Sequence, residues 1–265
     1  MDINLISEKI TEAMREAGKI MLSADRVERS VKEKAGSANF VTEYDVAVQN
    51  YLIDKISKLL PEAYFFAEEK ENDVDIEQVK YCFVIDPIDG TANFINGYRR
   101  STISVALLCF GEAVFGAIYD PYQKEMFSAI AGKGAFLNGK PIHVSERPLE
   151  RALIVFGTSP YHKPSLANDT FSLAKELFLV ANDLRRTGSA ALDLANFAAG
   201  RSDIFFECLL QLWDIAAGCL IVKEAGGIVT DLAGRPISMR GASSVLAASE
   251  HLRSSILKIT EKYAR

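Results

Sequence analysis

The sequence predicts a mixed α/β fold built in layers, and three features of the chain lead to this prediction. Short apolar runs rich in β-forming residues fill residues 64–129, with Gly, Asn, Asp and Pro between them, as in a meandering antiparallel sheet. From about residue 146, strand-like and helix-like segments alternate, which is typical of a layered α/β arrangement. An amphipathic helix is expected at the start of the chain, because apolar residues recur at helical spacing at Ile3, Ile6, Ile10, Met14, Ala17 and Met21. We therefore expect two halves, an α+β half over 1–145 and an α/β half over 146–265.

The other elements follow from apolar runs and from breaker residues. A second helix is expected from about Tyr44 to Leu60, where Pro61 stops it. Strands are expected at 64–66, 81–85, 102–110, 113–119, 126–129, 152–156, 203–206, 228–230 and 244–248. Further helices are expected at 166–180, 189–199, 213–225 and 251–263. Tight turns are indicated by Gly132, Gly134, Asn138 and Gly139.

The composition is that of a soluble globular protein, and it narrows the function classes. Of the 265 residues, 49% are hydrophobic and 25% are charged, and the net charge of −5 argues against a nucleic-acid-binding surface, which needs clustered Lys and Arg. The negative net charge is still compatible with a small phosphorylated substrate, because bound divalent cations reverse the sign of the local electrostatic field. No signal peptide and no apolar stretch of about 18 residues is found, so no membrane span is expected. The four Cys residues form no CxxC pair, and we expect reduced thiols in a cytoplasmic protein.

The most informative segment is YCFVIDPIDGTANF, residues 81–94. A buried strand is expected to end at Ile85, since Pro87 cannot continue the ladder of hydrogen bonds. Asp86 and Asp89 then follow three residues apart, and two carboxylates at a rigid strand end can converge on one centre. Oxygen ligands of this kind suit Mg²⁺, which keeps open positions for water and phosphate. The segment therefore indicates a magnesium site.

The same segment is also compatible with an ordinary turn, because Asp, Pro and Gly dominate turns for local reasons. On spacing alone we give the two interpretations equal weight. If a site is present, Gly90, Thr91 and Ala92 could open a short helix whose free N–H groups receive phosphate oxygens. No GxSxG motif occurs and none of the three His residues sits in a nucleophile motif, so a serine hydrolase is not indicated.

Motifs along nearly the whole chain resemble the inositol monophosphatase family, lithium-sensitive magnesium phosphatases related to fructose-1,6-bisphosphatase. The segment DPIDGTANF resembles that family's metal-binding signature, and a second signature lies downstream in the right order at WDIAAGCLIVKEAGG, residues 213–227. Further matches are AEE at 67–69, NFVTEYD at 39–45, GKGAFLNGKPI at 132–142 and RRTGSAALDLANFAAGRSD at 185–203. The resemblance implies a layered αβαβα sandwich, a homodimer, lithium sensitivity and two or three Mg²⁺ ions per active site.

The resemblance also implies a set of metal ligands. By analogy with the family, Glu68, Asp86 and the backbone carbonyl of Ile88 bind the first metal. Asp86, Asp89 and Asp214 are similar to the ligands of a second, and a third, weaker metal would also use Glu68. Glu69 is the rival of Glu68, which we prefer by register. Taken alone, Asp214 is more typical of a helix N-cap than of a ligand.

The remaining implied residues act on the water, the phosphate and the alcohol. Glu68 is expected to help take the proton from the attacking water, and Thr91, paired with Asp45, to orient that water. The N–H groups of Gly90 and Thr91 would hold the phosphate, and Lys34 matches a supporting lysine near the site. For the polyol, the matching positions are Asp89, Gly188, Ser189, Ala190 and Glu207. On its own, Glu207 is also compatible with an ordinary strand-end carboxylate on a solvated face.

The leading hypothesis is hydrolysis of inositol 1-phosphate, a small phosphorylated polyol. Fructose 1,6-bisphosphate is the main rival, alone or as a second substrate, and it needs an extra cation for its second phosphate. The candidates for that cation are Arg99, Arg100, Arg185 and Arg186. A hypothesis of another class is a non-catalytic partner in a transcription complex, since some bacterial relatives act there. The intact acidic cluster argues against a purely structural role, because clustered carboxylates are costly without a cation.

Overall fold

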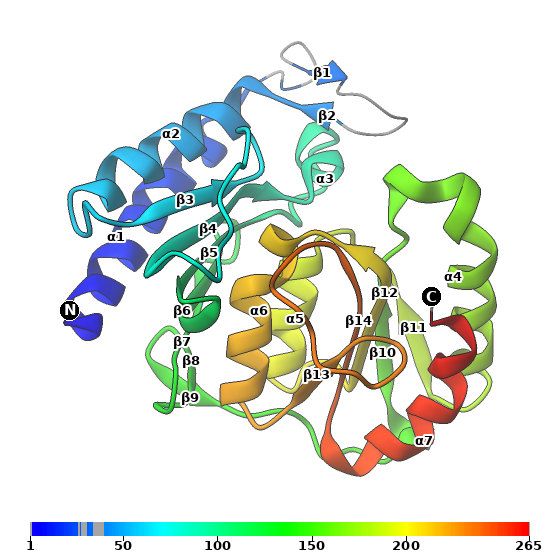
Figure 1. Cartoon of the computed structure of the whole chain (residues 1–265). Coiled ribbons are helices and arrows are strands. Elements are labelled where there is room, and N and C mark those ends of the chain that lie inside the picture. The colour runs from blue at the N-terminus through cyan, green and yellow to red at the C-terminus, as the bar shows by residue number, and fades with distance from the viewer. Residues whose placement is uncertain (1, 26, 28–30, 34–39, 265) are drawn as a thin grey trace.

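The computed structural model describes residues 2–25, 27, 31–33 and 40–264, and these form five stacked layers of helices and sheets (Figure 1). One pair of helices covers the outer face of a seven-stranded sheet, a second pair lies between that sheet and a five-stranded sheet, and a third pair covers the far face. This αβαβα sandwich confirms the expected fold. Lys34 lies outside the described residues.

The seven-stranded sheet is almost wholly antiparallel, as the meandering pattern predicts. Only its first two strands run parallel, and its strand order follows the sequence. Its strands are β3 (Tyr64–Ala67), β4 (Tyr81–Asp89), β5 (Thr102–Cys109), β6 (Glu112–Asp120), β7 (Glu125–Ile130), β8 (Ala135–Leu137) and β9 (Lys140–Ile142). The last two were not predicted, because three residues are too few for a visible alternation. Two further short strands, β1 (Lys32–Glu33) and β2 (Phe40–Val41), pair with each other.

The five-stranded sheet has the order β11-β10-β12-β14-β13, and β10 is parallel to both of its neighbours. Its strands are β10 (Leu153–Phe156), β11 (Asp183–Arg185), β12 (Ile204–Leu210), β13 (Ile228–Thr230) and β14 (Ser243–Ala248). The sequence predicts four of these, and the short edge strand β11 is the one it misses.

The helices match the predicted positions closely. The long helices are α1 (Ile3–Leu22), α2 (Glu43–Ser57), α4 (Lys163–Phe178), α5 (Ala190–Ala198), α6 (Leu212–Glu224) and α7 (Glu250–Thr260). The short ones are α3 (Thr91–Ile95), η2 (Leu149–Arg151), η3 (Pro160–His162) and η4 (Glu261–Tyr263). Helix α2 ends three residues before the predicted Leu60, since a turn closed by N–H bonds of residues 59 and 60 to Ile56 reverses the chain ahead of Pro61.

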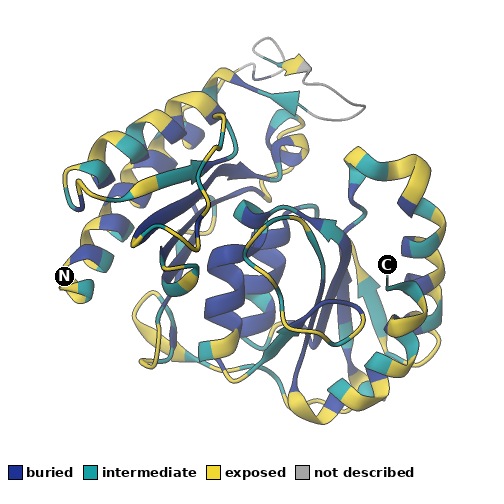
Figure 2. Cartoon of the chain, in the orientation of Figure 1, coloured by how far each residue is buried: buried dark blue, intermediate teal, exposed yellow. Residues whose placement is uncertain are grey.

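Three apolar cores hold the layers together, and the buried residues lie where helices and sheets face one another (Figure 2). The period of two assigns the side chains of β4 to two of them: Phe83 and Ile85 face α1 and α2, while Cys82 and Val84 face α6. The strand is buried on both faces, which is why it reads as a continuous apolar run. As far as Asp86, its even-numbered residues therefore point into the layer between the sheets.

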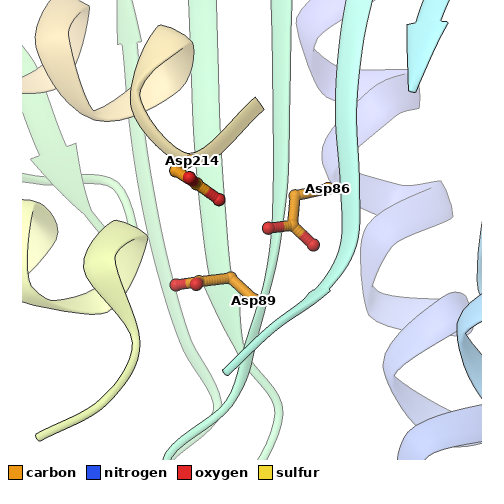
Figure 3. Close-up of side chains that lie close together, drawn as sticks. All are labelled: Asp86, Asp89 and Asp214. Atoms are coloured by element: carbon orange, nitrogen blue, oxygen red, sulfur yellow. The ribbon is translucent and has the colours of Figure 1, made fainter. Parts of the chain in front are cut away.

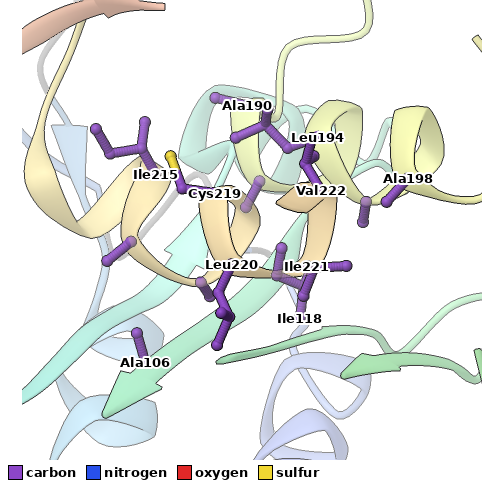
Figure 4. Close-up of a cluster of buried hydrophobic side chains, with 14 of the residues drawn as sticks. Ala106, Ile118, Ala190, Leu194, Ala198, Ile215, Cys219, Leu220, Ile221 and Val222 are labelled. Carbon is purple, nitrogen blue, oxygen red and sulfur yellow. The ribbon is translucent and has the colours of Figure 1, made fainter. Parts of the chain in front are cut away.

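Helix α6 lies at the centre of the molecule, between the seven-stranded sheet and helix α5 (Figure 4). Because it is packed on most sides, apolar residues cover most of its circumference. Small residues allow this close packing. A Cβ added to Gly116 of β6 would lie 2.8 Å from the carbonyl oxygen of Ala217, and one added to Gly218 would lie 2.6 Å from a methyl of Leu194 on α5. The core between the two sheets contains residues from both halves of the chain. The division of the chain into two units at residue 145 is therefore kept as a proposal. Within the described residues, no helix combines the length and apolar character that crossing a membrane requires.

Candidate active site

The acidic turn lies within strand β4, which corrects the prediction that the strand ends at Ile85. Pairing with β5 continues at Asp86 and resumes at Asp89, with a register shift between them. Pro87 interrupts the ladder but does not end it, because a bulge absorbs the extra residue. The bulge matters for direction. Asp86 points to the α6 face by the period of two, and one extra residue turns Asp89 to that same face.

The carboxylates of Asp86, Asp89 and Asp214 converge on one point (Figure 3). One oxygen from each lies within 4.8 Å of the others, although Asp214 comes from helix α6, more than a hundred residues along the chain. Asp86 and Asp89 are buried and Asp214 is partly buried. The described structure therefore brings together three of the four carboxylates on which the predicted site depends.

Asp214 is held by the start of helix α6. It is the third residue of that helix, and its Oδ2 accepts the backbone N–H of Gln211, the N-cap, at 2.7 Å. The interpretation of Asp214 as the N-cap is therefore wrong, because the N-cap is Gln211, three residues earlier. Asp214 instead accepts the second hydrogen bond of a capping box at the helix start. That bond fixes the carboxylate so that it faces β4.

Asp89 is held by the start of helix α5. Its Oδ2 accepts the hydroxyl of Ser189, the N-cap of α5, and the N–H of Ala191 at 2.8 Å. A helix N-terminus stabilises negative charge because its first N–H groups lack partners within the helix. Two of the predicted polyol-pocket residues, Ser189 and Ala190, are thereby placed against a predicted metal ligand.

The three carboxyl groups of the cluster oppose one another's ionisation. Burial raises the pKa of Asp86 well above its ordinary value, and repulsion from Glu68, Asp89 and Asp214 raises it further. Burial also raises the pKa of Asp214, again with repulsion from Asp89 and Glu68. For Asp89, burial raises the pKa while the hydrogen bond from Ser189 opposes the rise. Three carboxyl groups that resist ionisation together are a site that a divalent cation would stabilise.

Glu68 borders this cluster without joining the three oxygens. It directly follows β3, its N–H donates to the carbonyl of Ile85, and its side chain is partly buried. Its charge acts on Asp86 and Asp214, whose pKa values it raises. Glu69, its rival, donates its N–H to Gln49. The position of Glu68 fits the preference given to it over Glu69.

Asp45 and Thr91 do not share a direct hydrogen bond, which departs from the expected pair. The Thr91 hydroxyl donates to the carbonyl of Ile88 at 3.2 Å, while Asp45 Oδ2 accepts the N–H of Thr42 at 2.8 Å and its hydroxyl at 2.5 Å. Burial raises the pKa of Asp45 to about 6, and nearby Glu69 adds to the rise. The other oxygen, Asp45 Oδ1, is buried and has no hydrogen-bond partner among the described residues.

Gly90 and Gly188 bring two distant motifs into backbone contact. Gly90 has φ of 86° and precedes the short helix α3, as predicted. A Cβ on Gly90 would lie 3.0 Å from the carbonyl oxygens of Arg100 and Gly188. Only glycine combines this left-handed backbone with so close an approach. The predicted phosphate-binding turn and the predicted polyol pocket are consequently neighbours.

Glu207 lies in the middle of β12 and is buried, so the alternative of a solvated strand end is wrong. Its Oε1 accepts the N–H of Ser159 at 2.7 Å, and a Cβ on Gly157 would collide with its carboxylate. Burial raises the pKa of Glu207 to about 7, and the charge of Asp89 contributes to the rise. Glu207 is thus held by the chain between β10 and η3 and lies within electrostatic range of the acidic cluster.

Comparison with known proteins decides the family. Residues 4–265 match the Inositol monophosphatase family. The chain belongs to this family. It is 41% identical over 231 residues to Nus factor SuhB of Escherichia coli K12, a match covering 84% of this chain and 83% of the relative.

Two solved structures support the same assignment. Extragenic suppressor protein suhB from Bartonella henselae has a TM-score of 0.88 at 34% identity and covers 96% of this chain and 98% of its own. Thermotoga maritima IMPase has a TM-score of 0.84 at 32% identity and covers 95% of each chain. The resemblance stated from the motifs is confirmed, and membership of the inositol monophosphatase family accounts for the layered fold.

The residues of this family member suit a hard divalent cation. The three convergent donors are carboxylate oxygens, which Mg²⁺ prefers, and no Cys or His joins them among the described residues. Their raised pKa values and the unpartnered Asp45 Oδ1 mark a region where negative charge exceeds what the protein itself compensates. The donor set therefore fits the metal that the family uses.

Sequence reasoning missed residues on the segment that follows β10. Gly157 and Ser159 position Glu207. Tyr161 is 42% exposed, but loss of solvent around its phenol and the charges of Glu68 and Asp214 raise the pKa of Tyr161 above its ordinary value, so the phenol lies within electrostatic range of the acidic cluster. The signal was the run GTSPY, a Gly-containing turn with an aromatic residue directly after a predicted strand. Such a turn at a strand end is a common place for functional residues.

Proposed function

We propose that this chain is a magnesium-dependent phosphatase that hydrolyses the phosphate monoester of a small polyol or sugar, with inositol 1-phosphate as the leading substrate. The convergence of Asp86, Asp89 and Asp214 within 4.8 Å carries the proposal. Holding buried carboxylates so close together costs free energy, because they repel one another and are removed from water. A bound cation offsets that cost.

Asp86, Asp89 and Asp214, with Glu68 and the carbonyl of Ile88, are the proposed ligands of two or three Mg²⁺ ions. When bound, Mg²⁺ lowers the pKa of water and neutralises charge on the phosphate and the leaving oxygen. Glu68 stands beside the cluster with a partly buried carboxylate, and in this proposal it accepts the proton of the attacking water.

The phosphate and the water are positioned by the turn after β4. The N–H groups of Gly90 and Thr91 receive phosphate oxygens, because they open helix α3 and lie next to the ligand Asp89. The proposed role of Asp45 and Thr91 is to orient the water. No direct bond joins them, so we infer that a water molecule bridges the unpartnered Asp45 Oδ1 and the Thr91 hydroxyl. Positioning of this kind supplies much of the catalysis in phosphoryl transfer.

The polyol is proposed to lie between α5 and β12. Gly188, Ser189 and Ala190 line one side at the start of α5, and Glu207 lines the other. Glu207 has a pKa of about 7, so it can accept or donate a hydrogen bond to a substrate hydroxyl near neutral pH. Asp89 already accepts two hydrogen bonds through Oδ2. In this proposal its Oδ1 binds a metal ion or accepts a hydrogen bond from a substrate hydroxyl.

The test is phosphate release from inositol 1-phosphate with Mg²⁺ and with EDTA, alongside calorimetric titration of Mg²⁺ into the metal-free protein. We expect release only with Mg²⁺, and binding that is lost in Asp86→Asn. A panel including fructose 1,6-bisphosphate ranks the substrates, because that ester is the main rival. Absence of release from every ester at saturating Mg²⁺ would overturn the proposal.

A role as a binding partner in a transcription complex is the second candidate, favoured by the name Nus factor carried by the Escherichia coli relative. The two functions make opposite predictions for Asp89→Asn. A purely binding role leaves partner capture intact in this variant and shows no turnover in the wild type. A phosphatase loses turnover in the variant.

We also propose a homodimer, because apolar residues are exposed beside a sheet edge that pairs with no further strand among the described residues. Phe178, Leu179 and Val180 are exposed at the end of α4. The chain then enters β11, an edge strand of the five-stranded sheet. An exposed apolar patch beside an unpaired edge is a common interaction surface.

A further inference from the structure

The side chain of Asn93 joins three chain segments where the proposed phosphate and polyol sites meet. Asn93 lies in the short helix α3 and is buried. Its Nδ2 donates to the carbonyl of Arg100 at 2.7 Å and to the carbonyl of Thr187 at 2.9 Å. Arg100 lies just before β5, whereas Thr187 lies 94 residues beyond Asn93, in the turn that leads into α5. Both hydrogens of the Asn93 amide therefore hold backbone from other segments.

The turn before α5 packs directly on this amide group. A Cβ built on Gly188 would lie 3.0 Å from Nδ2 and 3.1 Å from Oδ1 of Asn93, so no side chain fits between them. Gly188 has φ of 95°, a conformation that glycine adopts without strain. Its carbonyl oxygen would in turn lie 3.0 Å from a Cβ on Gly90. The phosphate-binding turn (residues 90–91) and the polyol-binding turn (residues 187–189) are thus in contact, with Asn93 holding one to the other.

Thr187 is also held from the side of helix α5. Its hydroxyl donates to Asp193 Oδ1 at 2.5 Å, and Asp193 is a buried residue of that helix. Burial raises the pKa of Asp193 well above its ordinary value, and the bond from Thr187 opposes the rise. The polyol-binding turn is therefore tied to α3 through a carbonyl group and to α5 through a hydroxyl group of the same residue.

We propose that Asn93 is a positioning residue that holds the polyol-binding turn at the distance from the phosphate-binding turn that a polyol monophosphate requires. The covalent structure of such an ester fixes the distance between its phosphorus and its hydroxyl groups, so the two turns must match it. A displacement of about 1 Å costs roughly a hundredfold in rate when a substrate has to be aligned. This inference rests on the proposed phosphatase function and concerns how its site selects a polyol ester.

The experiment compares inositol 1-phosphate with p-nitrophenyl phosphate, an ester that offers the phosphate without a polyol. In Asn93→Ala we expect the ratio of kcat/KM for inositol 1-phosphate to that for p-nitrophenyl phosphate to fall about tenfold or more. Asn96→Ala is the matched control and should keep the wild-type ratio. Asn96 lies at the end of the same helix, where its exposed Nδ2 donates only to the carbonyl of Ala92, at 2.8 Å.

A second pair of variants tests the same turn without changing Asn93. Thr187→Val removes the hydroxyl at almost constant volume and leaves buried Asp193 without that bond. Thr187→Ser keeps the hydroxyl. We expect the ratio to fall several-fold in Thr187→Val and to stay close to that of the wild type in Thr187→Ser. This pair decides the question if circular dichroism shows that Asn93→Ala does not fold.

The remaining outcomes separate this inference from its foundation. If Asn93→Ala lowers kcat/KM for both esters by the same factor, or changes neither, the side chain only supports the fold and the inference is wrong. If the wild type hydrolyses neither ester, the proposed function fails, and calorimetric titrations of inositol 1-phosphate and inorganic phosphate with Mg²⁺ decide. A loss of affinity in Asn93→Ala that is about tenfold greater for the ester than for phosphate supports the positioning role. Equal losses, or no binding of the ester to the wild type, overturn it.

Discussion

Ser189 donates its hydroxyl hydrogen bond to Asp89, which joins the N-terminus of helix α5 to the bulge of strand β4 across 100 residues of sequence. The same carboxylate oxygen accepts the N–H of Ala191. Each bond lowers the pKa of Asp89, while burial raises it. A proposed metal ligand is thus fixed in position by a segment that is also proposed to line the polyol pocket, so substrate binding and metal binding share one support.

Asp89→Asn is expected to lower kcat by about a hundredfold or more while the fold is kept. The amide oxygen of Asn can accept the bonds from Ser189 and Ala191, but its NH₂ group would replace the carboxylate oxygen that faces the metal. Steady-state kinetics with inositol 1-phosphate and circular dichroism check this. Asp54→Asn on the exposed face of α2 is the control and should keep full activity. Near-normal turnover in Asp89→Asn would count against the site.

Asp86→Asn is expected to raise the thermal stability of the metal-free protein by a few degrees and to abolish stabilisation by Mg²⁺. Repulsion from Glu68, Asp89 and Asp214 contributes to the raised pKa of Asp86, and a neutral side chain removes that repulsion. Its Oδ1 accepts the N–H of Ile88 at 3.0 Å, a bond that Asn can keep. Melting temperatures in EDTA and in Mg²⁺ test both parts. A variant that Mg²⁺ still stabilises as much as the wild type would contradict the ligand assignment.

Much of the fold follows from the sequence because long periodic segments dominate it. The amphipathic spacing of α1 and the continuous apolar run of β4 each leave one reasonable interpretation. The strands β8, β9 and β11 were missed because three residues show no period. The extent of β4 was misjudged because Pro87 excludes a ladder bond, and sequence does not reveal that a bulge lets pairing resume.

Site residues that belong to a sequence motif could be predicted. The sequence could not show which of several similar residues the tertiary contacts bring to the site. Four arginines were equal candidates in the sequence. In the structure, the guanidinium of Arg186 lies against the turn at Gly188 and donates a hydrogen bond to the hydroxyl of Thr158, a residue of another segment. The separate hydrogen bonds of Asp45 and Thr91 were likewise not visible, because Thr42 competes locally for Asp45 through a capping box.

Glu207→Gln is expected to flatten the pH dependence of the stability of the metal-free protein. The pKa of Glu207 rises from an ordinary value of 4.5 to about 7 on folding, so the folded state binds more protons and stability falls as pH rises through this window. The loss amounts to about 3 kcal/mol at most. Urea unfolding at pH 4.5 and pH 8 should show a smaller difference in Glu207→Gln than in the control Glu16→Gln, which changes an exposed residue of α1. Equal differences would refute the shift.

Gly157→Ala is expected to raise KM for the polyol phosphate several-fold and to destabilise the protein by about 1–3 kcal/mol. A Cβ at this position would collide with the carboxylate of Glu207, which the N–H of Ser159 holds in place. Gly241→Ala is the control, because a Cβ there would meet no atom within 4 Å. Kinetics and urea unfolding of both variants test the claim. Unchanged KM in Gly157→Ala would mean that Glu207 does not contact the substrate.

Leu179→Glu is expected to convert a dimer into a monomer that keeps its fold. Leu179 is 72% exposed, next to the exposed Phe178 and Val180 and just before the edge strand β11. Burying a charge at this position would cost far more than a surface substitution, provided that a second copy of the chain covers it. Light scattering after gel filtration measures the mass of each variant. Leu22→Glu, at the 50% exposed end of α1, is the control and should remain a dimer. If both variants and the wild type elute as monomers, the surface at the end of α4 does not serve self-association.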